Sequence, residues 1–222
     1  EAYRSPAIEG YCSRQSVAAG ETIEFMISAN PPARYTIEVF RTGYYGGRGA
    51  RLMTTLGPLQ GTRQSDPDVT ERRLIECRWQ PGASLKIPSD WVSGVYLGRL
   101  TTLPEKSDQP YWQSYVVFIV RDDRPADILF QCSDNTWQAY NRWPGSYSLY
   151  DSGQPGMTST PDVDVSFDRP YGKYRQIYDN PQSVGSGEWL CWEYPLAYWL
   201  EQHGYDVAYC SNSDVLTPQR GM

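Results

Sequence analysis

Short runs of alternating apolar and polar residues recur through the first half of the chain, and this pattern limits the possible folds more than any other feature. Such runs are typical of half-buried β-strands. They cover residues 22–27, 35–40, 74–79, 94–100 and 114–120, with turn-forming Gly, Pro and Asn residues between them. Because these runs follow one another with almost no helical periodicity, we expect residues 1–122 to form an Ig-like β-sandwich.

The pattern changes after a charged, proline-terminated hinge near residue 122. Residues 127–131 and 206–210 predict two short buried strands, and residues 192–203 predict a helix that ends at a glycine. A strand, a long connection, a helix and a second strand together make a βαβ unit. We therefore expect residues 123–222 to begin an open α/β domain of the Rossmann or amidotransferase-like kind.

This second domain is expected to be incomplete. Two strands and one helix are too few for a parallel sheet, because purely parallel sheets are buried on both faces. We expect a segment beyond Met222 to complete it, as a separate chain: the C-terminal half of the same precursor after proteolytic processing, or another subunit. The chain is then part of a hetero-oligomer.

Residues 133–190 form an unusually long connection that is rich in Gly, Pro, Ser and Asp and carries ten aromatic residues. Loops of this length in compact domains are usually functional or disordered. This one leaves the carboxyl end of a predicted parallel strand, where open α/β sheets place their binding sites. We therefore expect the functional region here, as a long aromatic loop over the sheet.

The composition excludes several classes of function. A formal net charge of -6 spread along the chain offers no basic surface for nucleic acid or anionic lipid, and no apolar run is long enough to cross a membrane. One histidine, His203, excludes a three-histidine zinc site within the chain. Cys12 and Cys77 could form a disulfide or stay as inert buried thiols. The sequence leaves two cellular locations open: the cytoplasm, and export after removal of an N-terminal segment.

Segments in both halves of the chain carry a family resemblance. They read IEGY (8–11), VFRTGYYGG (39–47), SDWVSGVY (89–96), NTWQAYN (135–141), SLYD (148–151), VSFDRPY (165–171) and WEYPL (192–196). In this order they resemble the N-terminal portion of proteins related to the large (beta) subunit of N,N-dimethylformamidase. The resemblance implies hydrolysis of the C–N bond of a small N-alkylformamide or related amide, in an α/β domain that continues past Met222.

The resemblance also implies a metal site. It would hold one mononuclear ferric iron between two tyrosinates and a glutamate, and the iron would act as a Lewis acid. The matching tyrosines are Tyr140 and Tyr150, with Tyr171 as the substitute if the segments align differently, and the glutamate would lie outside this chain. The alternative is that both rings simply pack in the aromatic loop with their hydroxyls hydrogen-bonded.

Other side chains near these tyrosines are candidates for catalysis or substrate binding, each with a structural alternative. A carboxylate at a helix start is a possible general base or a complement to the helix dipole. A cysteine after a strand is a possible nucleophile or an inert thiol. Asparagines can orient a substrate or cap a turn, and an arginine can bind a carboxylate. The catalytic candidates are Tyr140, Asn135, Cys132 and Glu193, and the substrate-binding candidates are Trp137, Asn141, Arg169 and Tyr171.

Two rival functions stay open at this point. A β-sandwich with exposed aromatic loops is also typical of non-catalytic carbohydrate-binding or surface proteins. A cysteine-dependent amidohydrolase would use Cys132 or Cys210 and would lose activity on alkylation without any dependence on metal.

Overall fold

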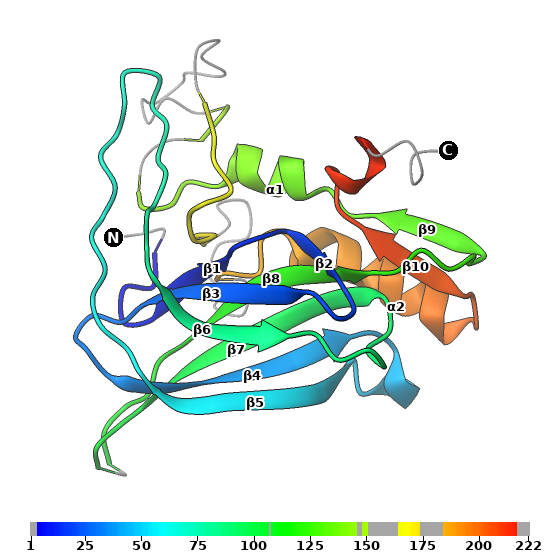
Figure 1. Ribbon diagram of the computed structural model, residues 1–222, viewed down its shortest axis with the longest axis horizontal. Coiled ribbons are helices and arrows are strands. Elements are labelled where there is room, and N and C mark those ends of the chain that lie inside the picture. Colours follow the sequence, from blue (N-terminus) through cyan, green and yellow to red (C-terminus); the bar gives the residue numbers. More distant parts are fainter. Residues whose placement is uncertain (1–3, 107, 146–147, 151–163, 174–183, 217–222) are drawn as a thin grey trace.

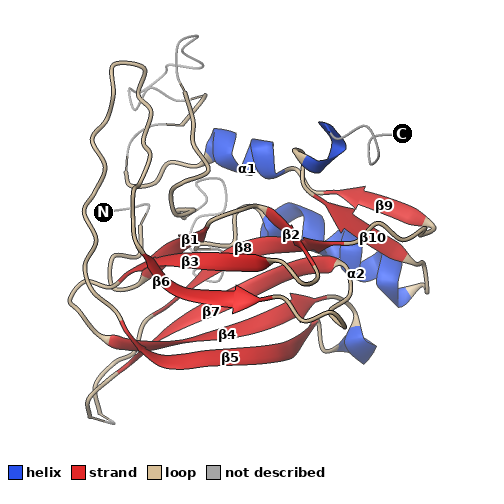
Figure 2. Ribbon diagram, viewed as in Figure 1, coloured by secondary structure: helices blue, strands red, loops and turns tan. Residues whose placement is uncertain are grey.

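The computed structural model describes residues 4–106, 108–145, 148–150, 164–173 and 184–216, and the fold is rich in β-structure (Figures 1 and 2). The strands are β1 (Glu9–Cys12), β2 (Ser16–Ala18), β3 (Thr22–Ser28), β4 (Arg34–Thr42), β5 (Ala50–Gln60), β6 (Pro81–Lys86), β7 (Gly94–Leu103), β8 (Gln113–Arg121), β9 (Ile128–Gln131) and β10 (Val207–Cys210). The helices are α1 (Asp134–Tyr140) and α2 (Tyr194–Gln202), with a π-helical turn at Trp189–Glu193 and 3₁₀ turns at Tyr45–Gly47 and Asp214–Leu216.

Two β-sheets face each other across an apolar core (Figure 1). One sheet has the strand order β2-β8-β7-β4-β5, and the other has the order β1-β3-β6. Alternate residues of these strands point inward, as a period of two requires. The buried core between the sheets includes Phe25, Ile37, Tyr96 and Phe118. Tyr96 stacks on Phe118 with a ring separation of 5.5 Å.

Four of the five alternating runs are strands, namely β3, β4, β7 and β8. The prediction of a strand at residues 74–79 is wrong, because this segment has only an isolated bridge between Val69 and Ile75. Its inward-facing side chains, Ile75, Cys77 and Trp79, are buried, which explains the alternation. The amide of Cys77 donates to the carbonyl oxygen of Asp168 at 2.6 Å and so bonds to a loop instead of a sheet.

The second half contains the two predicted strands and the predicted helix. β9 and β10 pair in parallel, with Ile128 opposite Val207 and Gln131 opposite Cys210. The helix begins later than the pattern predicts, because residues 189–193 form a π-helical turn before α2. The long connection also contains α1, which the sequence did not predict.

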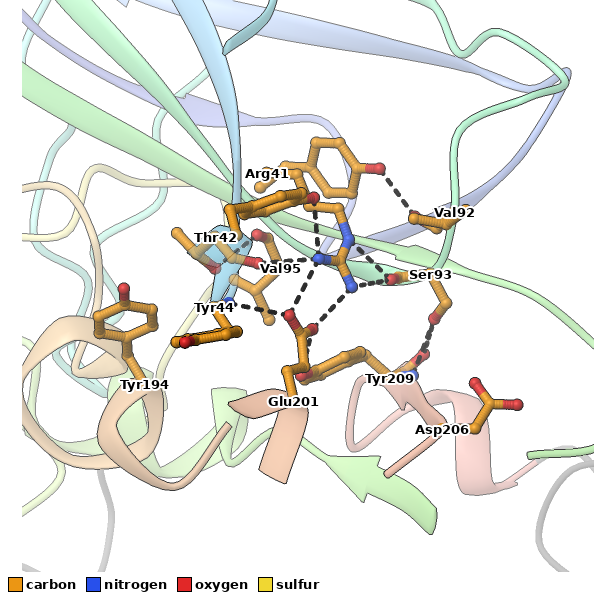
Figure 3. A network of polar contacts seen from close by, with 12 residues as sticks. Arg41, Thr42, Tyr44, Val92, Ser93, Val95, Tyr194, Glu201, Asp206 and Tyr209 are labelled. Atoms are coloured by element: carbon orange, nitrogen blue, oxygen red, sulfur yellow. Dashed lines mark hydrogen bonds and ion pairs between the residues drawn. The ribbon is translucent and has the colours of Figure 1, made fainter. Parts of the chain in front are cut away.

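The elements after residue 122 pack directly on the outer face of the five-stranded sheet. Val95 and Val117 of that sheet share a buried cluster with Trp137, Trp189 and Leu200. A second contact joins the same parts: the guanidinium of Arg41, at the end of β4, binds the carboxylate of Glu201 in α2 at 2.8 Å (Figure 3). We call this ion pair the Arg41–Glu201 clasp. The division of the chain into two domains at residue 122 stays a prediction.

Cys12 and Cys77 are free thiols, so the option of a disulfide between them is wrong. Both side chains are buried, and the loss of solvent raises the pKa of each thiol above its usual range. Their role is apolar packing. Within the described ranges, no helix combines the length and the apolar character needed to cross a membrane.

Candidate functional site

Tyr140 and Tyr150 lie against each other at the end of α1. Their ring centroids are 4.8 Å apart and the ring planes are tilted by 45°. The contact forms because the chain turns back onto the helix, where the amide of Leu149 donates to the carbonyl oxygen of Ala139 at 2.9 Å. The two residues keep 39% and 44% of their surface exposed, so a solute can reach both rings.

Trp137 lies on the opposite, buried side of α1. Only 3% of its surface is exposed, and its ring lies 6.3 Å from that of Tyr171 and 6.5 Å from that of Trp189. The indole NH donates to Glu193 at 2.8 Å. The structure therefore places this substrate-binding candidate in the core between α1 and the sheet, where it holds the helix in place.

Glu193 is held by the same contacts. Its carboxylate accepts hydrogen bonds from the indole of Trp137 and from the amide of Ser133 at 3.2 Å. Burial is the main cause that raises the pKa of this carboxyl group, and these hydrogen bonds oppose the rise. The hydrogen bonds found in the described part of the chain do not link Glu193 to Tyr140 or Tyr150.

Asn141 and Arg169, two further substrate-binding candidates, are buried in one polar network. Both the nitrogen and the oxygen of the Asn141 side chain form hydrogen bonds there. The amide nitrogen of Asn141 donates to Gln138 and to the carbonyl oxygen of Pro170, and its oxygen accepts from two backbone amides. Arg169 donates to oxygens of Gln138, Asn141 and Trp143. These contacts are to the protein itself, and a role of the two side chains in substrate binding stays a prediction.

Cys132 follows β9 as the sequence predicted, but it is fully buried. Desolvation is the main cause that raises the pKa of its thiol well above the usual range, and the nearby carboxylates of Glu193 and Asp134 add to the rise. The reactive form of cysteine is the thiolate. Cys210 is buried as well, at 4% exposure. These surroundings favour inert thiols over a cysteine nucleophile.

The last two candidates lie on different sides of α1. Asn135 is exposed in the first turn of α1, and its backbone amide donates to the side-chain oxygen of Asn212 at 3.0 Å. Tyr171 is half-buried and lines a small cavity together with Asp134 and Trp137. Burial raises the pKa of the Tyr171 hydroxyl well above its usual range. The structure thus brings Tyr150, and not Tyr171, into contact with Tyr140.

Asp134, the first residue of α1, is a buried carboxylate at the carboxyl end of β9. One oxygen accepts from the amide of Asn212 at 2.6 Å, and the other has no hydrogen-bond partner among the described residues. Burial raises its pKa to about 6, with smaller contributions from Asp214 and Glu193. Tyr171 shares the cavity beside it.

This raised pKa predicts a pH-dependent stability. A folded-state pKa above the unfolded one means that the native state binds more protons between about pH 4 and 6, so stability falls as the pH rises through this range. We expect Asp134→Asn to flatten that fall and to raise the free energy of unfolding at pH 7 by about 1–3 kcal/mol. Urea unfolding from pH 4 to pH 7 measures both effects. Asp68→Asn, at an exposed carboxylate, is the control; an unchanged slope in Asp134→Asn would contradict the account.

Sequence reasoning missed two residues that build this region. Gln138 carries three of the contacts in the network below Tyr140, and Leu149 provides the amide that brings Tyr150 to α1. Both lie inside the segments that carry the family resemblance, NTWQAYN and SLYD. That resemblance was the available signal, because seven residues of helix are too few to show a helical period.

The usual metal-binding side chains do not cluster in the part of the chain that the structure describes. There, no group of three or more His, Cys, Asp or Glu side chains is arranged to hold a metal ion.

Comparison with known proteins gives a family. No curated protein matches the chain. Among solved structures, one titled "Crystal structure of HiLPMO9B" aligns with 73% of this chain and 69% of its own, at 17% identity and a TM-score of 0.30, a likeness too low to carry an argument. A family profile described as "N,N-dimethylformamidase beta subunit-like, C-terminal" matches residues 36–221. The chain belongs to the N,N-dimethylformamidase beta subunit-like family.

Proposed function

We propose that the chain is a subunit of a metal-dependent hydrolase that cleaves the C–N bond of a small N-alkylformamide or a related amide. The observation that carries this proposal is the contact between the exposed rings of Tyr140 and Tyr150, 4.8 Å apart, in a member of the dimethylformamidase-like family. In the proposal, these two tyrosines are ligands of one ferric ion.

The donor chemistry of this pair fits iron. A phenol has a pKa of about 10, so it binds a metal at neutral pH only where a hard, highly charged cation stabilises its anion. Tyrosinate ligation of iron is known in haem catalases. Two phenol groups that are partly exposed and side by side can be reached by such an ion, and a carboxylate from outside this chain would complete the set. The chemistry supplied by the bound ion is Lewis acidity toward an amide carbonyl.

The chain's own residues would contribute position and access. The turn at residues 148–150 holds Tyr150 against α1 through the amide of Leu149. Asn135, exposed on the same helix, is a candidate for orienting a substrate. Glu193 remains a candidate general base, and its raised pKa suits proton transfer nearer neutral pH.

We further propose the finer architecture that the sequence suggested. The two facing sheets would be an Ig-like sandwich over residues 1–122, and residues 123–222 would be part of an α/β domain. A second chain, either the other half of a common precursor or another subunit, would cover the outer side of α2. The support is a row of exposed apolar residues there, Trp192, Leu196 and Trp199, because a large exposed apolar patch often marks an interface.

The proposed activity has a direct test. We expect the protein in its native assembly to release formate and an alkylamine from an N-alkylformamide, and we expect removal of iron by a chelator to abolish this release. Adding back ferric iron restores it. Tyr111→Phe, at a ring that is 61% exposed on the sandwich, is the control that keeps full activity. Hydrolysis that survives complete removal of metal would contradict the proposal.

One observation favours the rival carbohydrate-binding function. Tyr111 and Trp112 are 61% and 56% exposed, and Trp112 lines a hollow of about 570 Å³ beside Pro31, Pro104 and Gln109. Exposed aromatic faces with polar neighbours are typical of sugar-binding surfaces. A metal-independent change in tryptophan fluorescence on addition of oligosaccharides, lost in Trp112→Ala, would favour this function.

A further inference from the structure

Arg169 is a buried cation whose role the proposed function does not use. Only 2% of its surface is exposed, and burial lowers its pKa to about 10. Its hydrogen-bond partners among the described residues are neutral oxygens: the side chain and backbone of Gln138, both at 3.1 Å, and the carbonyls of Asn141 and Trp143, both at 3.3 Å. Burying a charge without a counter-ion is unfavourable. The contacts of Arg169 therefore have to stabilise the local structure in a way that a neutral side chain would not.

The oxygens that Arg169 binds belong to the last turn of α1 and to the turn that follows it. The final carbonyls of a helix have no partner within the helix. A cation there also suits the negative end of the helix dipole. The guanidinium offers five N–H groups in one plane, so it can hold several carbonyls in a fixed arrangement. Arg169 therefore closes the carboxyl end of α1.

A second set of hydrogen bonds joins the turn after α1 to residues 169–172, and these bonds are made by the side chain of Asn141. The side chain of Asn141 donates to the carbonyl oxygen of Pro170 at 2.9 Å, and its oxygen accepts from the amide of Gly172 at 3.0 Å. The same oxygen accepts from the amide of Trp143 at 3.1 Å. Segment 169–172 and the turn after α1 are thus bound by contacts from both sides, which fixes the backbone that carries Tyr140.

Tyr150 is anchored to the same turn of α1. The amide next to it, that of Leu149, donates to the carbonyl oxygen of Ala139, which is the residue before Tyr140. The relative position of the two rings therefore depends on the geometry of this one turn. We propose that Arg169 is a positioning residue that sets the placement of Tyr140 against Tyr150; its link to metal binding rests on the proposed function.

Two measurements test this role, and the first needs no metal. Photo-oxidative crosslinking joins neighbouring tyrosines, and mass spectrometry of peptides gives the yield of the crosslink between Tyr140 and Tyr150. We expect this yield to fall several-fold in Arg169→Met and Arg169→Lys, because lysine keeps the charge but not the planar set of donors. If Arg169→Met does not fold, Arg169→Lys alone decides. An unchanged yield in a folded variant overturns the proposal.

The second measurement is the affinity for ferric iron, added as ferric nitrilotriacetate. Substitutions that misplace a ligand in this way lower metal affinity by about 10–100-fold, and we expect a loss of this size in both variants. The matched control is Arg41→Met, which removes another buried arginine, that of the Arg41–Glu201 clasp. It should lose stability but keep both the crosslink and the affinity of the wild-type chain.

The two proposals can fail separately. If the wild-type chain binds no iron but the crosslink is lost in Arg169→Lys, the positioning role stands and the proposed metal site is wrong. If the wild-type chain binds iron and the Arg169 variants bind it equally well with an unchanged crosslink, the positioning role is wrong. If Arg41→Met loses the crosslink as much as the Arg169 variants do, the effect follows general destabilisation and the positioning role is also wrong.

Discussion

Replacing Arg41 with methionine is expected to lower the free energy of unfolding by about 3–5 kcal/mol. The guanidinium donates to the carboxylate of Glu201 at 2.8 Å and to the carbonyl oxygen of Ser93 at 2.8 and 3.0 Å (Figure 3). The carboxylate also accepts from the amide of Tyr44 and the hydroxyl of Tyr209. The side chains of the ion pair are only 8% and 17% exposed, so the variant would leave a mostly buried carboxylate without its cation.

Urea unfolding at pH 7 measures this loss. Arg99→Met is the matched control, because Arg99 and Glu38 form an ion pair on the same sheet with 35% and 26% exposure. Such partly exposed pairs contribute about 0–1 kcal/mol. Arg41→Met combined with Glu201→Met should recover part of the stability, since the unpaired charge is gone. A loss below about 1 kcal/mol in Arg41→Met would show that the clasp does not join α2 to the five-stranded sheet in the way described.

The second large effect concerns the tyrosine pair. Tyr140→Phe or Tyr150→Phe keeps the ring and its packing but removes the phenol oxygen, the only group through which either residue can bind a metal ion. Changing a residue behind a ligand lowers metal affinity by about 10–100-fold, so we expect loss of a ligand itself to lower ferric affinity by at least about 100-fold. Equilibrium dialysis against ferric nitrilotriacetate measures the change.

These variants separate metal binding from folding. Both tyrosines are partly exposed, so the free energy of unfolding without metal should stay within about 0.5 kcal/mol of that of the wild-type chain. Tyr111→Phe controls for weak surface binding, since Tyr111 is more exposed than either ring of the pair. Equal iron binding by the double variant, Tyr140→Phe with Tyr150→Phe, would contradict the assignment.

Much of the β-structure could be predicted from residue alternation, and the exceptions have physical causes. β4 buries alternate residues over most of its length, and β7 does so in its second half, so a period of two is visible in the sequence of each strand. β5 is mostly exposed on both faces and carries no such alternation, and it was missed. Residues 74–79 alternate because Ile75, Cys77 and Trp79 face the core, although their backbone bonds to a loop. Alternation of apolar and polar residues indicates which side chains are buried. It does not indicate whether the backbone pairs with another strand.

Only part of the candidate site could be predicted from the sequence, because its arrangement depends on tertiary contacts. The approach of Tyr140 to Tyr150 follows from a backbone bond between Leu149 and Ala139 that has no signature in the sequence, and only the family resemblance pointed to the pair. Arg169 lay in the right region, but its partners are some 26–31 residues earlier in the chain. Whether a polar side chain faces solvent or closes a helix depends on such tertiary contacts, so sequence alone could not assign its role.

The visible absorption spectrum of the protein in its native assembly with ferric nitrilotriacetate tests the central claim most directly. Tyrosinate bound to ferric iron gives an intense charge-transfer band, whereas iron on carboxylates or at scattered surface sites does not. The account predicts a band that saturates at one iron per chain and disappears in both Tyr140→Phe and Tyr150→Phe. An assembly that shows no band at saturating iron, or a band that survives removal of both tyrosines, would contradict it.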